Sequence, residues 1–309
     1  MKILVMGAGA VGSAIGGFLA KSGNDVTLVG SKDHMDVIQN GFLKISGIWG
    51  EHKITPLKST DSINGIPKQD LVLLTTKASD TKQAAKDMLP IMKDRTVILS
   101  LQNGVGNEQI LQKICGKNVL GGTLLIGFEL VALGHVKITA FADKIKIGEL
   151  DHVRSERVEK IVKLFNDSEI PTEAVDNINH HLWSKLLHNS CLNPLGALLN
   201  VNYGALKNDH TWILIQQIIN EVFQVADAEN VDLLWDKPGE YELFLKEKLL
   251  PTTKKHRSSM LHDLENGMKT EICFLNGKIV ELGKKNNIPT PVNSMLCDLI
   301  QFRENSVSK

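Results

Sequence analysis

Short apolar runs alternate with longer amphipathic stretches through the first half of the chain. The runs KILVM, DVTLV, DLVLLTTK, TVILSLQN and VLGGTLLIG have the length and composition of buried parallel strands. Between them, stretches such as TKQAAKDMLPIM place apolar residues at helical spacing. Strands that alternate with helices predict a mainly parallel, doubly wound α/β sheet. The segments LKIS, HKIT, VKITA and KIKIGEL predict shorter strands, in hairpins at an edge of that sheet.

The pattern changes near residue 176, after a helical stretch SERVEKIVKLFND and a strand-like PTEAV. From Asn177 onward the apolar residues recur at helical spacing, as in IINEVFQVADAEN, EYELFLKEKLL and SSMLHDLENGMKTEICFLNGKIVELGKKN. Prolines and glycines separate these stretches. The chain is therefore expected to form a sheet-containing domain over residues 1–176 and an all-helical domain over 177–309.

The first apolar run raises a question of its own, because no charged residue occurs from Ile3 to Ala20. That is close to the length of about 20 apolar residues that spans a bilayer, and small residues after a lysine also occur in signal peptides. However, the run contains GAGAVG, which has the form G-x-G-x-x-G between a predicted strand and a predicted helix. This context favours a dinucleotide-binding loop. Its residues are Gly7, Ala8, Gly9, Ala10, Val11 and Gly12.

Each glycine of the loop has a separate expected role. Gly7 permits the tight turn, Gly9 lets the backbone approach a pyrophosphate, and Gly12 lets the helix pack closely on the strand. The helix N-terminus then offers free N–H groups and a partial positive charge to the phosphates. The sequence thus predicts a Rossmann-type domain over residues 1–176.

The end of the second predicted strand indicates which dinucleotide is bound. NAD enzymes place Asp or Glu there to bind the ribose 2′-hydroxyl. Here the strand runs into Ser31 and Lys32, and a hydroxyl with a cation suits a 2′-phosphate. We therefore predict NADP(H), with a solvated turn over GSKD as the alternative. Asp33, an acidic residue, follows at once.

Composition excludes some classes of partner. Of the 309 residues, 42% are hydrophobic and 23% are charged, with a formal net charge of +0 and no basic block, so nucleic acid is not an expected partner. The four cysteines are far apart and lack metal-ligand spacing, which is typical of reduced core residues in a cytoplasmic protein. We expect neither a metal nor a membrane partner. The helical domain makes a homodimer a weaker expectation.

Polar residues at the carboxyl ends of parallel strands face the ligand crevice of a doubly wound sheet. Lys77 follows DLVLLTT, and Asn103 follows TVILSLQ. Both are therefore candidates for contact with the cofactor. A solvated lysine at a helix start and a simple turn asparagine are the alternatives.

The stretch HHLWSKLLHNSCLNPLGALLN predicts a polar face on a largely apolar helix. Lys185, Asn189 and Asn193 are spaced four apart, so they lie on one face. Pro194 removes one helical hydrogen bond and frees the carbonyl of Ser190. A lysine and two amides beside a local kink suit a ligand site, whereas a solvent-exposed face is the alternative. The adjacent pair at 180–181 does not face one site, so a metal is not expected there.

A second polar cluster occurs over residues 257–272. Ser259 is a candidate substrate contact, with helix capping as the alternative. Glu271 follows twelve residues later, and an exposed surface carboxylate is the alternative for it.

Several of these stretches occur together in one known family. The chain resembles the ketopantoate reductases (2-dehydropantoate 2-reductases), within the 6-phosphogluconate-dehydrogenase-like folds. The resemblance covers nearly the whole chain, through GAGAVG, TTKA, LQNGVGN, WSKLLHNSCLNPL, SSML with TEI downstream, and NNIPTPVN. The joint order of these motifs is far more specific than any one of them.

The resemblance implies NADPH-dependent reduction of 2-dehydropantoate to (R)-pantoate, in the pathway to pantothenate and coenzyme A. It implies that Lys185 is the general acid and that Glu271 engages this lysine, the substrate and the cofactor side of the site. It also implies that Asn189, Asn193 and Ser259 bind substrate. In the family, Asn103 lies where nicotinamide meets substrate, and Lys77 lines the cofactor crevice.

The chain departs from the family at two positions. An arginine often stands where this chain has Ser31, and a substrate asparagine of some members aligns with Tyr203. Two alternatives therefore stay open. One is a related reductase of another 2-oxo acid, and the other is a non-catalytic NADPH-binding sensor, although binding the cofactor alone needs neither Lys185 nor Glu271. We expect the two domains to form the site in the cleft between them.

Overall fold

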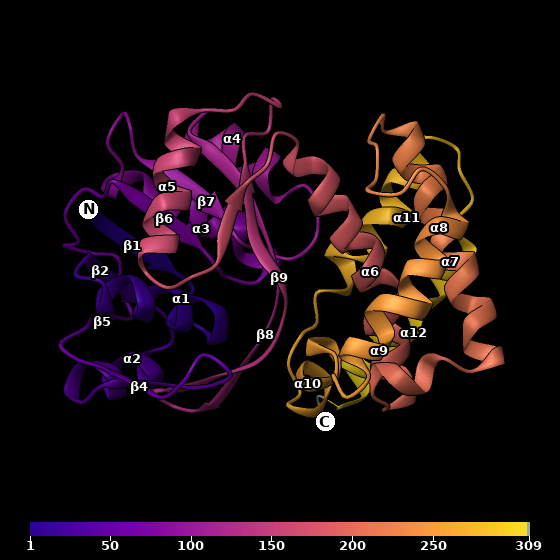
Figure 1. The fold of residues 1–309 in the computed structure, drawn as a ribbon, viewed down its shortest axis with the longest axis horizontal. Helices are drawn as coiled ribbons and strands as arrows, with labels where there is room; N and C mark the ends of the chain where they lie inside the picture. The colour runs from indigo at the N-terminus through magenta and orange to yellow at the C-terminus, as the bar shows by residue number, and fades with distance from the viewer. Residues whose placement is uncertain (308–309) are drawn as a thin grey trace. The chain divides into compact units, whose positions relative to one another are not determined.

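The computed structural model describes residues 1–307, which form two compact units (Figure 1). The first unit holds Met1–Gln102 and Gly106–Ile178. The second holds Asn103–Val105 and the chain from Asn179 onward. Loop residues 103–105 thus group with the helical unit, although they follow a strand of the sheet.

The first unit is built on a ten-stranded sheet in the order β4-β3-β9-β8-β7-β6-β1-β2-β5, with β10 paired to β9. Most neighbours are parallel, and the antiparallel pairs are β8 with β9 and β3 with β4. The strands are β1 (Lys2–Met6), β2 (Asp25–Val29), β3 (Leu43–Gly47), β4 (His52–Ile54), β5 (Lys58–Thr60), β6 (Leu71–Leu74), β7 (Val97–Ser100), β8 (Val119–Ala132), β9 (His135–Gly148) and β10 (Thr172–Ala174).

Helices cover both faces of this sheet (Figure 1). In β1, Ile3 and Val5 pack on one face and Leu4 packs on the other, and all three are fully buried. Burial on both faces explains why β1 is a continuous apolar run. The helices are α1 (Ala10–Lys21), α2 (Lys32–Asn40), α3 (Thr81–Met88), α4 (Asn107–Cys115) and α5 (Glu156–Asp167), with short 3₁₀ turns at Ala78–Asp80 and Leu89–Ile91.

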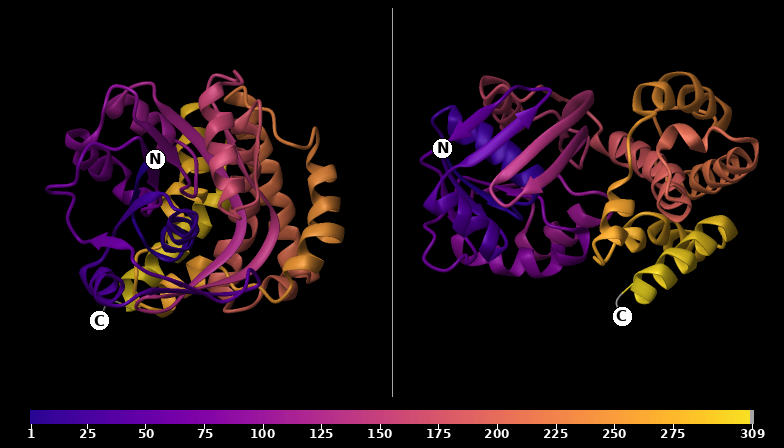
Figure 2. Two further views of the ribbon diagram at one scale, coloured as in Figure 1. Left: turned by 60° about the vertical axis from the view of Figure 1, so that its left-hand side comes forward. Right: turned by 90° about the horizontal axis from the view of Figure 1, so that it is seen from below.

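The hairpin of β8 and β9 differs from the prediction of short strands. VKITA and KIKIGEL belong to one strand, β9, and β8 extends past VLGGTLLIG to Ala132. The two strands have 14 residues each and run side by side (Figure 2). Their register shifts at several places, and these irregularities interrupt the simple alternation from which strand length was read. The predicted hairpin of β3 and β4 is confirmed.

The second unit is helical (Figure 1). Its α-helices are α6 (Ile178–Leu199), α7 (Asp209–Ala228), α8 (Pro238–Phe244), α9 (Leu250–Thr253), α10 (Ser259–Glu265), α11 (Asn276–Lys285) and α12 (Pro291–Val307). Shorter turns are η3 (Tyr203–Leu206), the π-helical η4 (Leu245–Leu249) and η5 (Ile272–Phe274). The stretch from Ser258 to Asn286 is therefore not one continuous helix. It breaks at Gly267, whose φ is +64°, so Glu271 lies in a turn and not three helical turns after Ser259.

A buried polar network holds α6 at its proline. The carbonyl of Ser190, freed by Pro194, accepts a hydrogen bond of 3.0 Å from Asn276 Nδ2 of α11. The same amide nitrogen donates to Asn293 Oδ1 of α12 at 2.9 Å. Asn293 Nδ2 in turn donates to Glu221 Oε2 of α7 at 2.6 Å. These bonds satisfy polar groups that the helical core would otherwise bury without partners.

Among the helices within residues 1–307, none combines the length and the apolar character needed to cross a bilayer. The charge-free run that begins at Ile3 is divided between β1, the glycine loop and α1.

Candidate functional site

The glycine loop of the first unit joins β1 to α1. Gly7 has φ +96°, and a Cβ there would lie 2.4 Å from Thr76 N. At Gly12 a Cβ would lie 2.5 Å from Thr75 Oγ1 and 2.7 Å from Gly7 O. At Gly9, by contrast, a Cβ would meet no atom within 4 Å. The loop is thus closely packed at Gly7 and Gly12 and open at Gly9.

The N-terminus of α1 is suited to an anion. Gly9 occupies the cap position without a side-chain cap, and the first turn has no acidic residue. Val11 is half-buried and Ala8 is buried, and Ala8 N donates to Val29 O at 2.8 Å. At the start of the helix, the N–H groups of Ala10, Val11 and Gly12 precede the first intrahelical bond, which Ser13 N makes to Gly9 O at 2.9 Å. Uncapped N–H groups beside open space fit a pyrophosphate.

Ser31 and Lys32 lie at the end of β2, where α2 begins. Ser31 is the cap residue of α2, but its hydroxyl makes no capping hydrogen bond. The Lys32 side chain is 72% exposed, and its Nζ lies 3.8 Å from Asp36 Oδ2. GSKD is therefore a helix start and not merely a turn, and both candidate groups are accessible to a ligand.

Lys77 follows the end of β6 in the first unit. Lys77 is half-buried and directly precedes the 3₁₀ turn Ala78–Asp80 after β6, so it lies at the start of a helical turn.

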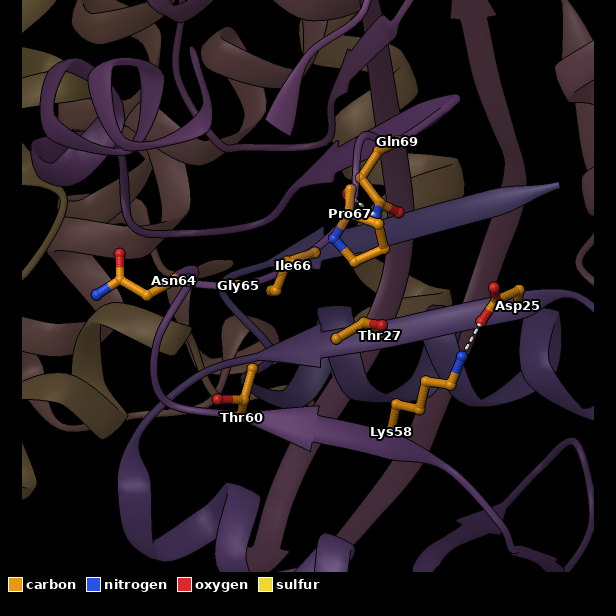
Figure 3. A pocket seen from close by; sticks show the side chains of 9 residues that line it. All are labelled: Asp25, Thr27, Lys58, Thr60, Asn64, Gly65, Ile66, Pro67 and Gln69. Carbon is orange, nitrogen blue, oxygen red and sulfur yellow. Dashed lines mark hydrogen bonds and ion pairs between the residues drawn. The ribbon is translucent and has the colours of Figure 1, made fainter. Parts of the chain in front are cut away.

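A separate cavity of about 260 Å³ lies beside β2 and β5 (Figure 3). The Asp25–Lys58 ion pair is at one end of the cavity, and Asn64 is at the other. None of the predicted site residues lines this cavity.

In the second unit, the polar face of α6 is not a solvent face. The exposed fraction is 8% for Asn189 and 4% for Asn193, and Lys185 is half-buried. Buried amides and a shielded ammonium are costly in a helix unless they meet partners. The alternative of a solvated stripe is therefore wrong.

The charge on Lys185 is set by two opposing influences. Burial lowers the pKa of Lys185 to about 8, while the negative charge of Glu271 acts to raise it. The sequence left open which would dominate, and in the structure burial does. A lysine with this pKa is still mainly protonated at neutral pH and releases its proton readily.

Glu271 is held in place by Asn103. Asn103 Nδ2 donates to Glu271 Oε2 at 2.8 Å, and the adjacent Gly104 would place a Cβ 2.4 Å from Phe274 O. The loop 103–105 is thus packed against the turn that carries Glu271. Glu271 is half-buried, so the alternative of an exposed surface carboxylate is wrong.

Ser259 is the first residue of α10 and is exposed. The helix is capped by its neighbour, since Ser258 Oγ accepts from Leu261 N at 3.1 Å. The capping alternative for Ser259 is therefore wrong. Its role as a substrate contact stays a prediction.

Sequence reasoning missed an aromatic cluster beside Asn193, formed by His188, Tyr203 and His256. Tyr203 packs edge-on against both imidazole rings, at centroid distances of 6.1 Å and 5.0 Å. The Tyr203 hydroxyl donates to Asn193 Oδ1 at 2.5 Å. Burial, the charge on His256 and the charge on Lys185 lower the pKa of His188 to about 3, so this ring is neutral. The sequence offered one indication of this cluster. His188 follows Lys185 by three residues, a spacing that places the two side chains close together on a helix.

With this geometry in view, comparison with known proteins gives the family. Residues 3–152 match the family model described as "Ketopantoate reductase PanE/ApbA", and residues 177–304 match the model of its C-terminal domain. This chain belongs to the ketopantoate reductase family. Curated 2-dehydropantoate 2-reductases from Aquifex aeolicus and Pyrococcus horikoshii are each 36% identical to it over 98% of the chain. The match spans 97% and 98% of those relatives.

Solved structures of similar proteins agree with the ketopantoate reductase fold. A PanE/ApbA family ketopantoate reductase from Ralstonia eutropha has a TM-score of 0.91 at 29% identity, with 100% of both chains covered. A ternary structure of D-mandelate dehydrogenase with NADH and anilino(oxo)acetate has a TM-score of 0.89 at 28% identity, again over 100% of both chains. The fold is therefore shared by a ketopantoate reductase and a D-mandelate dehydrogenase.

Proposed function

We propose that this chain reduces 2-dehydropantoate to (R)-pantoate with NADPH, a step of pantothenate biosynthesis. The observation that carries the proposal is the second unit's polar face. It combines a half-buried ammonium of lowered pKa at Lys185 with two buried amides, and the charge of the Glu271 carboxylate acts on that ammonium. Full-length similarity to 2-dehydropantoate 2-reductases supports the same reaction.

The first unit's residues fit a nicotinamide dinucleotide. The uncapped start of α1 and the open space at Gly9 would hold the pyrophosphate, and Ser31 with Lys32 would hold a 2′-phosphate. We propose that Lys77 and Asn103 bind the cofactor as well. When bound, NADPH supplies the hydride to the ketone carbon.

Lys185 supplies the proton that the reduced ketone needs. Negative charge develops on the ketone oxygen as the carbon accepts hydride, and an ammonium close to that oxygen stabilises it. Lys185 Nζ then donates its proton to the oxygen and becomes a neutral amine. Glu271 keeps Lys185 protonated before the reaction, because its charge acts to raise the pKa of that lysine.

Asn193 is proposed to hold the substrate through its amide nitrogen. Because Tyr203 donates to Oδ1, the two N–H groups on Nδ2 are directed elsewhere and can donate to a carboxylate or a hydroxyl. Asn189 and the exposed hydroxyl of Ser259 add further polar contacts for a 2-oxo acid.

Tyr203→Phe should raise the KM for the oxo acid by about three- to tenfold with little change in kcat. The variant removes one hydrogen bond worth about 1 kcal/mol, which orients the Asn193 amide but takes no part in proton transfer. Steady-state kinetics at saturating NADPH measure the change. The chain's other tyrosine, Tyr241, is fully buried with no hydrogen-bond partner for its hydroxyl, so Tyr241→Phe is a matched control. Equal KM values for the two variants would remove Tyr203 from substrate binding.

A second candidate is reduction of another 2-oxo acid. The aromatic rings around Asn193 and the similarity to a D-mandelate dehydrogenase favour an oxo acid with a bulky apolar substituent. NADPH oxidation followed at 340 nm with 2-dehydropantoate and a panel of 2-oxo acids distinguishes the candidates by kcat/KM. Preference for an aromatic oxo acid would replace the proposed substrate. Absence of turnover with every acid, despite NADPH binding, would favour a sensor.

Lys32→Ala should weaken NADPH binding by about tenfold and leave NADH binding unchanged. A charge-assisted hydrogen bond to a phosphate contributes about 1.5–3 kcal/mol, and the exposure of Lys32 places it at the lower end. Fluorescence titration with each cofactor measures the effect. Lys68→Ala, another exposed lysine of the first unit, is the control. If the unmutated chain bound NADH and NADPH equally well, the predicted 2′-phosphate site would be wrong.

We also propose a cytoplasmic homodimer. One structurally similar protein, from Staphylococcus aureus, is described as a dimeric ketopantoate reductase, with a TM-score of 0.80 at 20% identity. Light scattering of the full chain, with and without NADPH, measures the oligomeric state.

A further inference from the structure

Three buried hydrogen bonds tie the glycine loop to α2 and to the β8–β9 hairpin. Ser13, in the first turn of α1, donates through Oγ to the carbonyl of Ala8 at 3.1 Å. The same Oγ lies 3.0 Å from His34 Nε2 of α2. His34 Nδ1 accepts from the backbone N–H of Gly134, in the hairpin turn, at 2.9 Å.

The direction of each hydrogen bond in this series follows from the bond between Gly134 and His34. Gly134 N–H can only donate, so Nδ1 of His34 is an acceptor and carries no proton. In the neutral ring the proton is then on Nε2, which donates to Ser13 Oγ. The Ser13 hydroxyl in turn gives its own proton to the Ala8 carbonyl. Each polar group in the series therefore has a partner of the correct kind.

His34 is neutral in this position. Ser13 is fully buried and His34 is 1% exposed, and burial lowers the pKa of His34. The charged neighbours on its own helix, at 32, 33 and 36, are exposed, and burial is the sole cause of the shift. A second proton on the ring would set Nδ1–H against Gly134 N–H, two donors facing each other.

The position of His34 in the chain gives these bonds a consequence for the cofactor. Ala8 belongs to the loop proposed to hold the pyrophosphate, and His34 lies two residues after Lys32 in the first turn of α2. We propose that His34 is a positioning residue. It fixes the position of Ser31 and Lys32, the residues proposed to bind the 2′-phosphate, relative to the glycine loop. The proposal rests on the proposed NADPH dependence, and it is independent of which oxo acid is reduced.

A specific effect on cofactor choice follows. Both NADP⁺ and NAD⁺ carry the pyrophosphate, but only NADP⁺ must meet the glycine loop and residues 31–32 at once. Loss of this relative position should therefore weaken the binding of NADP⁺ more than the binding of NAD⁺. A residue that only stabilised the fold would weaken both equally.

The experiment is titration of the full chain with NADP⁺ and with NAD⁺, without substrate, for four variants. His34→Leu should raise the Kd for NADP⁺ by about five- to twentyfold and the Kd for NAD⁺ by less than threefold. Ser13→Ala should change the two Kd values in the same direction by a smaller factor, because it removes both bonds of the Ser13 hydroxyl but leaves the bond between His34 and Gly134 in place. His34→Gln keeps a donor near the position of Nε2 and should restore most of the NADP⁺ affinity.

Ser46→Ala is the matched control. Ser46 Oγ makes a comparable hydrogen bond of 2.8 Å to His135 Nε2, between β3 and the same hairpin, away from the glycine loop. It should change neither Kd. Melting temperatures confirm that every variant is folded during the titration.

The outcomes separate the two ideas. If the unmutated chain failed to bind NADP⁺, the proposed function would fail first. If it bound NADP⁺, and His34→Leu changed the two Kd values by the same factor or left both within twofold, the positioning role of His34 would be overturned.

Discussion

Lys185→Met should lower kcat for the oxo acid by about 10²- to 10⁴-fold while NADPH still binds. The variant removes both the proton donor and the positive charge that stabilises the developing oxyanion. It keeps a long apolar side chain in the half-buried position, so α6 should remain packed. Stopped-flow turnover and NADPH titration of the same preparation measure the two quantities.

Lys207→Met is a control with an exposed lysine of the same unit, and its kcat should be unchanged. Turnover of Lys185→Met within a few-fold of the unmutated chain would remove Lys185 from the mechanism. The 185–189–193 face would then be a structural feature of α6.

The pH dependence gives a second measure of the same residue. The general acid must be protonated, so kcat/KM should be level below pH 8 and fall about tenfold per pH unit above it, since the pKa of Lys185 is about 8. Glu271→Gln removes the charge that raises this pKa, so the fall should begin at lower pH. An unchanged profile in Glu271→Gln would show that Glu271 does not act on Lys185.

Glu221→Ala should lower the stability of the helical unit by about 3–5 kcal/mol and its melting temperature by roughly 10 °C. The carboxylate of Glu221 is buried and accepts from Val292 N at 2.9 Å, Asn293 N at 3.0 Å and Asn293 Nδ2 at 2.6 Å. These backbone N–H groups are the start of α12, so the variant leaves a helix N-terminus buried without its acceptor.

Thermal unfolding of the full chain, followed by calorimetry with the two units resolved, measures the loss. Glu247→Ala, at an exposed glutamate of the same unit, should stay within about 0.5 kcal/mol of the unmutated chain. The loss of stability in Asn276→Ala should fall between these two values, because this variant removes the bonds to Ser190 O and Asn293 Oδ1 but leaves the Glu221 contacts in place. A loss in Glu221→Ala no larger than in Glu247→Ala would contradict the role of the network.

Local features of the sequence determined the fold class and the candidate residues. A G-x-G-x-x-G loop between an apolar strand and a helix requires only neighbouring residues to be recognised, and so does a polar stripe at four-residue spacing. The family resemblance came from the order of such motifs along the whole chain. Interactions between residues close in sequence leave a periodic pattern, which is why these features were legible.

The tertiary structure decided what depends on contacts between distant residues. The sequence could name burial and Glu271 as opposing influences on Lys185, but only the packing shows that burial dominates. The partner of Ser190 O is 86 residues away, and the partner of His34 Nδ1 is 100 residues away. A hydrogen bond across such a separation leaves no periodicity in the sequence, because its geometry exists only once the elements have packed. For the same reason the sequence placed Glu271 on a helix, whereas the positive φ of Gly267 ends α10 and turns the chain toward Asn103.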